Sequence, residues 1–84
     1  MRLDKYLKIS RLVKRRTVAK QIADQGRILI NGKVGKSSSE LNIGDQLTLN
    51  FGNQVLVVKV LALKENAQKN EAGELYQLIA EKEK

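Results

Sequence analysis

The sequence predicts an α+β fold in which two short N-terminal helices pack on one face of a small curved antiparallel sheet. Two observations lead to this class. Apolar residues recur at helical spacing between residues 2 and 25. Between residues 27 and 63 they alternate with polar residues, and two-residue turns interrupt them. Two helices followed by a run of strands have one economical arrangement, in which the helices cover one face of the sheet.

The first predicted helix covers residues 2–9. Its apolar face consists of Leu3, Tyr6 and Leu7. Because Tyr6 shares this face with two leucines, we expect it in the core and not on the surface as a stacking platform. Asp4 falls in the first turn, where a carboxylate suits the positive end of the helix dipole. Alternatively, Asp4 pairs with Arg16 or another cation and orients it toward a ligand, and the sequence leaves both roles open.

The second predicted helix covers residues 17–25 and follows a charged connection at residues 10–16. Thr17 or its predecessor is expected to cap this helix. Gly26 is expected to end it, because glycine readily adopts the left-handed conformation that follows many helices. The expected apolar stripe consists of Val18, Ala19, Ile22 and Ala23.

Antiparallel strands are predicted from residue 27 onward. Asn31-Gly32 separates two runs of alternating residues, and this dipeptide is the strongest short signal for a hairpin. A second hairpin is expected to join residues 46–51 to residues 54–63 through Gly52-Asn53.

The C-terminal part of the sequence is less regular. Residues 64–73 are polar and are expected to form a loop or a helical turn. Residues 75–79 are expected to add a last strand, and residues 81–84 a frayed tail.

Positive charge is concentrated near the N-terminus. The chain contains 16 Lys and Arg residues and 9 Asp and Glu residues, for a net charge of +7. Residues 1–36 hold eleven of these cations and two of the acids, a net of +9, which leaves −2 for residues 37–84. A charge that served only solubility would be spread evenly, so this distribution indicates a polyanionic partner on one face.

The basic residues fall where two helices placed side by side would form a platform for phosphates. The triplet at residues 14–16 precedes the second helix, whose N-terminal amide groups attract anions. Arg16 and Lys20 are four residues apart, so they share one helical face. Lys5 and Lys8 are three apart on the first helix and do the same. As alternatives, the triplet forms a solvated loop and the two lysines are ordinary exposed helix positions.

The predicted hairpin tip adds a second group of candidate contacts. Asn31, Lys33 and Lys36 lie at or just beyond the turn, from which they would reach across a groove. Asn31 is first a requirement of the turn, and a contact role comes second. Since the chain has only three aromatic residues, we expect recognition of shape and backbone and little stacking on bases.

Several functional classes are disfavoured by composition. The chain has no histidine and no cysteine, so no catalytic base, thiol nucleophile or zinc site is expected, and we predict a protein that is not an enzyme and carries no cofactor. No apolar run approaches the roughly 18 residues of a membrane span. The charged N-terminus does not resemble a signal peptide, so we expect a cytoplasmic protein without membrane contacts.

Four segments in the same order resemble the alpha-L RNA-binding motif, a domain first described in a small-subunit ribosomal protein and shared with pseudouridine synthases and tyrosyl-tRNA synthetases. They are Arg2-Leu3-Asp4-Lys5-Tyr6-Leu7, Arg16-Thr17-x-Ala19, Gly26-Arg27-Ile28-x-Ile30-Asn31-Gly32 and Gly44-Asp45-x-Leu47. The resemblance covers about residues 1–60 and implies an RNA-binding domain at residues 1–63 with a C-terminal extension at residues 64–84. Arg15 departs from the family pattern, which often has Ser or Thr before the motif arginine.

The length and the run from Ser10 to Thr17 are more similar still to the fifteen-kilodalton heat-shock protein group, which includes ribosome-quality-control P-site (RqcP-type) factors. This resemblance implies binding to a large ribosomal subunit that carries peptidyl-tRNA, with contacts to rRNA and tRNA. It also implies cooperation with an RqcH-type tailing factor as alanine tails are added to stalled chains. We expect a ribosome-associated monomer. The predicted RNA-binding residues are Arg2, Asp4, Lys5, Lys8, Arg11, Lys14, Arg15, Arg16, Thr17, Lys20, Asn31, Lys33 and Lys36.

Three other functions remain open at this point. The acidic C-terminal half would serve a protein-interaction module if the basic face were merely solvated. The chain would also suit another RNA-binding factor of ribosome assembly or heat shock. A targeting domain from an RNA-modifying enzyme ranks last, because 84 residues leave no space for a catalytic domain.

Overall fold

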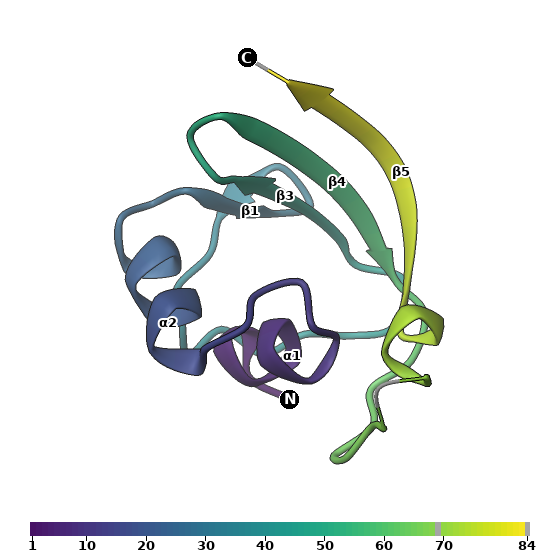
Figure 1. Ribbon diagram of the computed structural model, residues 1–84. Coiled ribbons are helices and arrows are strands. Elements are labelled where there is room, and N and C mark those ends of the chain that lie inside the picture. Colours follow the sequence, from purple (N-terminus) through teal and green to yellow (C-terminus); the bar gives the residue numbers. More distant parts are fainter. Residues whose placement is uncertain (69, 84) are drawn as a thin grey trace.

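Two layers, one of helices and one of strands, make up the computed structural model, which describes residues 1–68 and 70–83 (Figure 1). The α+β prediction is confirmed: both helices lie on the concave side of one curved antiparallel sheet. The elements are α1 (Leu3–Ile9), α2 (Arg16–Asp24), β1 (Ile28–Ile30), β2 (Lys33–Val34), β3 (Gln46–Asn50), β4 (Gln54–Val60), a 3-10 turn η1 (Ala72–Glu74) and β5 (Tyr76–Glu83).

The five strands lie in the order β2-β1-β3-β4-β5, and every neighbouring pair is antiparallel. Asn31 and Gly32 both have positive φ angles, 52° and 85°, as the tight hairpin turn between β1 and β2 requires. The second predicted hairpin is also present, with Gly52 at φ 92°. The register between β4 and β5 shifts between Val57 and Val58, where Ile79 of β5 has no partner, and such bulges increase the local twist of a sheet.

α1 lies deep in the core. Its residues Leu3, Tyr6 and Leu7 have no exposed surface, and they pack in one cluster with Leu47, Leu49, Val58 and Val60 of the sheet. The Tyr6 hydroxyl donates a hydrogen bond of 2.7 Å to the carbonyl oxygen of Leu75. The prediction that Tyr6 is a core residue is therefore confirmed.

α2 ends as predicted but begins differently. Gly26 has a φ of +76°, its amide donates to the Ala23 carbonyl, and the Arg27 amide donates to the Ile22 carbonyl, which is the Schellman arrangement. The predicted cap at Thr17 or its predecessor is wrong, because the helix already includes Arg16. Arg15 occupies the capping position without a side-chain hydrogen bond.

The apolar stripe of α2 is narrower than the sequence suggested. Ala19 and Ala23 are buried, Ile22 is half-buried, and Val18 is 38% exposed. Two alanines therefore make the closest contact of α2 with the core.

The C-terminal segment contributes more to the sheet than predicted. β5 extends from Tyr76 to Glu83, and its residues Glu81–Glu83 pair with Gln54–Leu56 of β4. A frayed tail is thus wrong for residues 81–83, while residue 84 lies outside the described residues. β4 ends at Val60 and not at residue 63. Leu75 is buried in the common core, and the division of the chain at residue 63 stays a prediction.

Within the described residues, no helix is long and apolar enough to cross a bilayer. The same residues contain no group of three acidic, histidine or cysteine side chains arranged to hold a metal ion.

Candidate nucleic-acid interface

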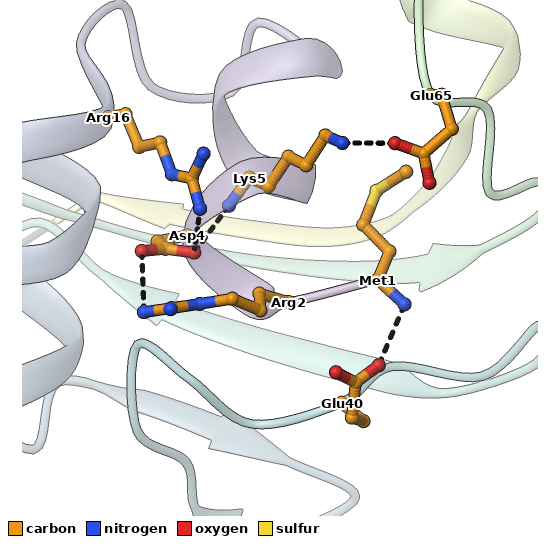
Figure 2. A network of polar contacts seen from close by, with 7 residues as sticks. All are labelled: Met1, Arg2, Asp4, Lys5, Arg16, Glu40 and Glu65. Atoms are coloured by element: carbon orange, nitrogen blue, oxygen red, sulfur yellow. Dashed lines mark hydrogen bonds and ion pairs between the residues drawn. The ribbon is translucent and has the colours of Figure 1, made fainter.

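A buried carboxylate, that of Asp4, lies between the side chains of Arg2 and Arg16 (Figure 2). Asp4 is in the first turn of α1 and is only 3% exposed. Its Oδ1 accepts hydrogen bonds from the Lys5 amide at 2.8 Å and from Arg16 Nη2 at 3.3 Å. Its Oδ2 accepts from Arg2 Nη2 at 3.3 Å. The structure contains both features considered for Asp4, because it lies in the first turn of α1 and pairs with Arg16. Its role in orienting Arg16 toward a ligand stays a prediction.

The two arginines come from different places in the chain. Arg2 precedes α1, and Arg16 begins α2, yet both guanidinium groups meet on one carboxylate. Their side chains are 45% and 48% exposed, so each group has one donor on Asp4 and further donors toward solvent. The carboxylate offsets the repulsion between the two cations and restricts their rotamers. The result is a pair of half-exposed guanidinium groups gathered on one carboxylate, and their remaining donors suit phosphate oxygens.

Lys5, on a second flank of α1, is paired with an acid. Its ammonium group contacts the Glu65 carboxylate, as Figure 2 shows. This hydrogen bond, together with the positive charge of Lys5, lowers the pKa of Glu65 below its usual range. Glu65 is exposed and belongs to the predicted loop at residues 64–73. One predicted contact residue is therefore partly neutralised by the C-terminal half.

Three further predicted cations lie at the end of α1 and in the connection to α2. Lys8, Arg11 and Lys14 are all exposed, and none of them forms an ion pair within residues 1–68 and 70–83. Arg11 has a φ of 61°, a left-handed conformation that is uncommon outside glycine. These side chains are free to accept an external anion.

The exposed face of α2 carries the next predicted residues. Thr17 and Lys20 border a hollow of about 480 Å³ together with Gln21, Asp24 and Gln25. Because Asp24 also lines this hollow, the hollow is less positively charged than the surface around Arg11. Arg15, immediately before the helix, is exposed.

The β1–β2 hairpin tip is tied to the sheet. The Asn31 amide group donates to Asp45 Oδ1 at 3.0 Å, and its oxygen accepts from the Gln46 amide at 2.9 Å. The turn role predicted for Asn31 is confirmed, and its contact role stays a prediction. Lys33 is exposed on β2, away from these hydrogen bonds.

The loop that follows β2 does reach the helices. The Asp4 amide donates to the Ser37 carbonyl at 3.1 Å, and the Leu3 amide to the Ser39 carbonyl at 2.8 Å. The exposed Lys36 therefore lies in a loop packed against the start of α1. This contact brings the segment that follows the hairpin next to Asp4.

Two features of this surface were not foreseen. Glu65 contacts Lys5, and the N-terminal amine of Met1 pairs with Glu40 at 2.8 Å (Figure 2). In both pairs the partners are far apart in sequence and fall outside every local motif. No periodicity or spacing would have revealed them.

The sequence of this chain is similar to those of known proteins. Residues 1–47 match the S4 domain. The chain is 54% identical to an RQC P-site tRNA stabilizing factor of Streptococcus pneumoniae over 96% of this chain and 92% of the relative. It is 53% identical to the factor of the same name in Bacillus subtilis, over 96% and 94% of the two chains.

A solved structure shows the same fold. The structure described as the trimeric structure of Vibrio cholerae Heat Shock Protein 15 is 31% identical to this chain, with a TM-score of 0.87. The similarity covers 95% of this chain and 82% of that one. Both layers of the fold thus lie largely within the matched region.

Proposed function

The chain belongs to the S4 domain family, and we propose that it binds RNA as a factor of ribosome-associated quality control. Its ligand is the large ribosomal subunit that still carries peptidyl-tRNA. It contacts both rRNA and the tRNA at the P site, and it supports the addition of C-terminal alanine tails by an RqcH-type factor. The protein acts by binding and performs no catalysis of its own.

One observation carries the RNA-binding part of this proposal. Arg2 and Arg16 lie on the two oxygens of the buried Asp4, with their remaining donors exposed. Holding two guanidinium groups before the ligand arrives reduces the entropy lost on binding. Two arginines held in this way suit a polyanion with regularly spaced phosphates. Arginines that are only solvated would not require a common carboxylate.

The aromatic residues favour recognition of RNA shape. Tyr6 is completely buried, and Phe51 and Tyr76 are half-buried members of the core. None of these three rings is largely exposed, so the described residues offer little ring surface on which an unpaired base would stack. Contacts to phosphate and ribose, which position a protein on a folded RNA, are what these side chains supply best.

The specific ribosomal role is supported by relatives. Proteins that share about half of their residues with this chain, over nearly their whole length, are named for stabilising tRNA at the P site. A tRNA in the P site next to rRNA presents two phosphate backbones close together. The basic residues spread over α1, α2 and the loop at residues 36–39 suit such a composite surface.

Sedimentation with large subunits tests the proposal. The wild-type protein is expected to comigrate with subunits carrying peptidyl-tRNA, and Arg16→Glu is expected to abolish comigration. Arg27→Glu is the matched control, because Arg27 is exposed, undergoes the same charge change and lies outside the predicted site. Equal losses in the two variants, or full binding by Arg16→Glu, would show that the site is misplaced.

Salt dependence and crosslinking complete the test. If about four to six cations neutralise phosphates, log affinity falls against log salt with a slope of roughly −3 to −5. In-cell UV crosslinking is expected to recover large-subunit rRNA together with tRNA. Crosslinks dominated by small-subunit rRNA or messenger RNA, or partners that all persist after nuclease treatment, would contradict the proposal.

A further inference from the structure

Two hollows that share two cations lie beyond the C-terminal end of α1. The first, of about 170 Å³, is lined by Lys8, Ile9, Arg11, Asn66 and Ala67. The second, of about 460 Å³, is lined by Lys8, Arg11, Val13 and Lys14. Lys8 and Arg11 thus form a cationic ridge between them, and neither hollow includes an acidic side chain among its lining residues.

The lining of the first hollow matches the parts of a nucleotide. Lys8 and Arg11 attract a phosphate, the Asn66 amide both donates and accepts hydrogen bonds, and Ile9 and Ala67 offer an apolar floor. A volume of 170 Å³ is below the roughly 300–1,000 Å³ of sites that enclose a whole small molecule. The hollow therefore suits one unit of a longer chain better than a free metabolite.

The cations of the ridge differ from the arginines on Asp4 in their ion pairing. Within residues 1–68 and 70–83, Lys8, Arg11 and Lys14 have no ion-pair partner, whereas Arg2 and Arg16 share one. A phosphate on the ridge would displace no internal contact. Arg11 also holds a left-handed backbone at φ 61°, a conformation that glycine adopts more easily. At this position the chain carries a guanidinium group despite the less favourable backbone.

We propose that the two hollows hold consecutive nucleotides of a single-stranded RNA segment, with the phosphate between them bound by Lys8 and Arg11. The Asn66 amide hydrogen-bonds the sugar or base edge in the first hollow, and Lys14 binds the next phosphate in the second. The inference rests on the proposed RNA-binding function and deepens it. It makes the segment around Asn66, which the sequence left without a role, part of the RNA interface.

The test compares a short fluorescein-labelled uridine oligonucleotide with a blunt RNA duplex, using the full-length protein. Arg11→Gly removes the guanidinium group at a backbone position that glycine tolerates, so the fold is retained. We expect this variant to bind the oligonucleotide about tenfold more weakly, because it loses a charged hydrogen bond. Asn66→Ala is expected to weaken binding about fivefold, while both variants bind the duplex within about twofold of wild type.

Lys59→Gln is the matched control. Lys59 is exposed on β4 between the buried Val58 and Val60, so its side chain faces away from the helices. It is expected to change affinity for the oligonucleotide by less than about twofold. Wild-type affinity in Asn66→Ala, or an equal loss on both RNAs in Arg11→Gly, would overturn the inference. So would equal binding of an oligoglutamate peptide of matched charge. Arg16→Glu separates the two proposals, because loss of duplex binding there reports on the Asp4 site alone.

Discussion

α1 and α2 lie side by side on the same sheet, but they are attached to it in different ways. α1 buries Leu3, Tyr6 and Leu7 completely, and the Tyr6 hydroxyl reaches across to the backbone next to β5. α2 buries only Ala19 and Ala23 to a comparable degree. Large side chains thus fix the first helix, while two small ones set the second close to its neighbours.

This difference gives the two helices separate tasks. α1 carries the buried Asp4 and is positioned by the core, so it serves as the fixed reference for the basic surface. α2 carries Arg16, and the ion pair with Asp4 is its polar link to α1. Weaker apolar attachment makes α2 the helix whose position depends more on that link and on bound RNA.

The largest expected effect is on stability, from truncating Tyr6. Tyr6→Ala is expected to lower the free energy of unfolding by about 3–5 kcal/mol, because it removes a buried ring. That is a large share of the roughly 4–13 kcal/mol expected of a chain of this length. Urea unfolding followed by circular dichroism measures the change. Val18→Ala on α2 is the control, since Val18 is 38% exposed, and a loss as large as that of Tyr6→Ala would remove the contrast between the helices.

Breaking the link between the helices is expected to have the next largest effect. Asp4→Asn keeps the shape of the side chain and makes the protein more positive by one charge. A simple count of charges would then expect tighter RNA binding. We expect the opposite, a loss of about fivefold to tenfold, because Arg2 and Arg16 lose their common anchor, with about 1–3 kcal/mol of stability lost as well.

Fluorescence anisotropy with a duplex RNA measures the affinity of Asp4→Asn. Arg2→Gln and Arg16→Gln, each made with and without Asp4→Asn, provide a double-mutant cycle. Additive effects would show that Asp4 does not position the arginines. Coupled effects would assign it that role.

Alkaline pH tests the attachment of α1 to the strand side. Burial, and secondarily the neighbouring Tyr76, raises the pKa of Tyr6 well above its ordinary value near 10. The unfolded chain therefore loses this proton first as pH rises. The contribution of Tyr6 to the free energy of unfolding is fully present below about pH 10. Above that pH it should fall by about 1.4 kcal/mol per pH unit.

Tyr6→Phe removes this proton and is the reference for the alkaline experiment. We expect the variant to be less stable at neutral pH, since the Leu75 carbonyl loses its donor. Its stability should decline less steeply between pH 10 and 11.5. Parallel curves for the two proteins would mean that the phenol has its ordinary pKa in the fold.

The smallest expected effect concerns Lys5, on the flank of α1 away from α2. Glu65→Gln releases Lys5 from its ion pair, so RNA affinity is expected to rise about twofold in moderate salt. The gain should disappear at high salt, where exposed charges are screened. Glu74→Gln makes the same charge change at an exposed residue that forms no ion pair with Lys5, and equal gains in both variants would indicate a general effect of net charge.

Local signals account for the parts of the fold that were predicted from sequence. The helical spacing of Leu3, Tyr6 and Leu7, the Asn31-Gly32 turn and Gly26 each act within a few residues, and the structure contains all of them as expected. The start of α2 was misplaced because a hydroxyl cap was expected at its N-terminus. The helix begins instead at Arg16, without a side-chain cap.

Long-range contacts account for what was missed. The pairing of Glu81–Glu83 with β4 depends on partners about 27 residues earlier in the chain. The charged sequence of Glu81–Glu83 carries no local signal for a strand. The contact of Glu65 with Lys5 spans 60 residues. The basic character of the site was evident from sequence, whereas its division into anchored, neutralised and free cations required the fold.

The hydrogen bond from Tyr6 to Leu75 also has a consequence for the order of assembly. It joins residues 69 positions apart in a chain of 84, and β5 follows it directly. During synthesis α1, α2 and the β1–β2 hairpin are made first, yet the core that fixes α1 closes only after the last strand has emerged. Non-local closure of this kind slows folding. The basic half is therefore synthesised before the core beneath it is complete, and the protein should gain RNA affinity only after Leu75 and β5 have been made.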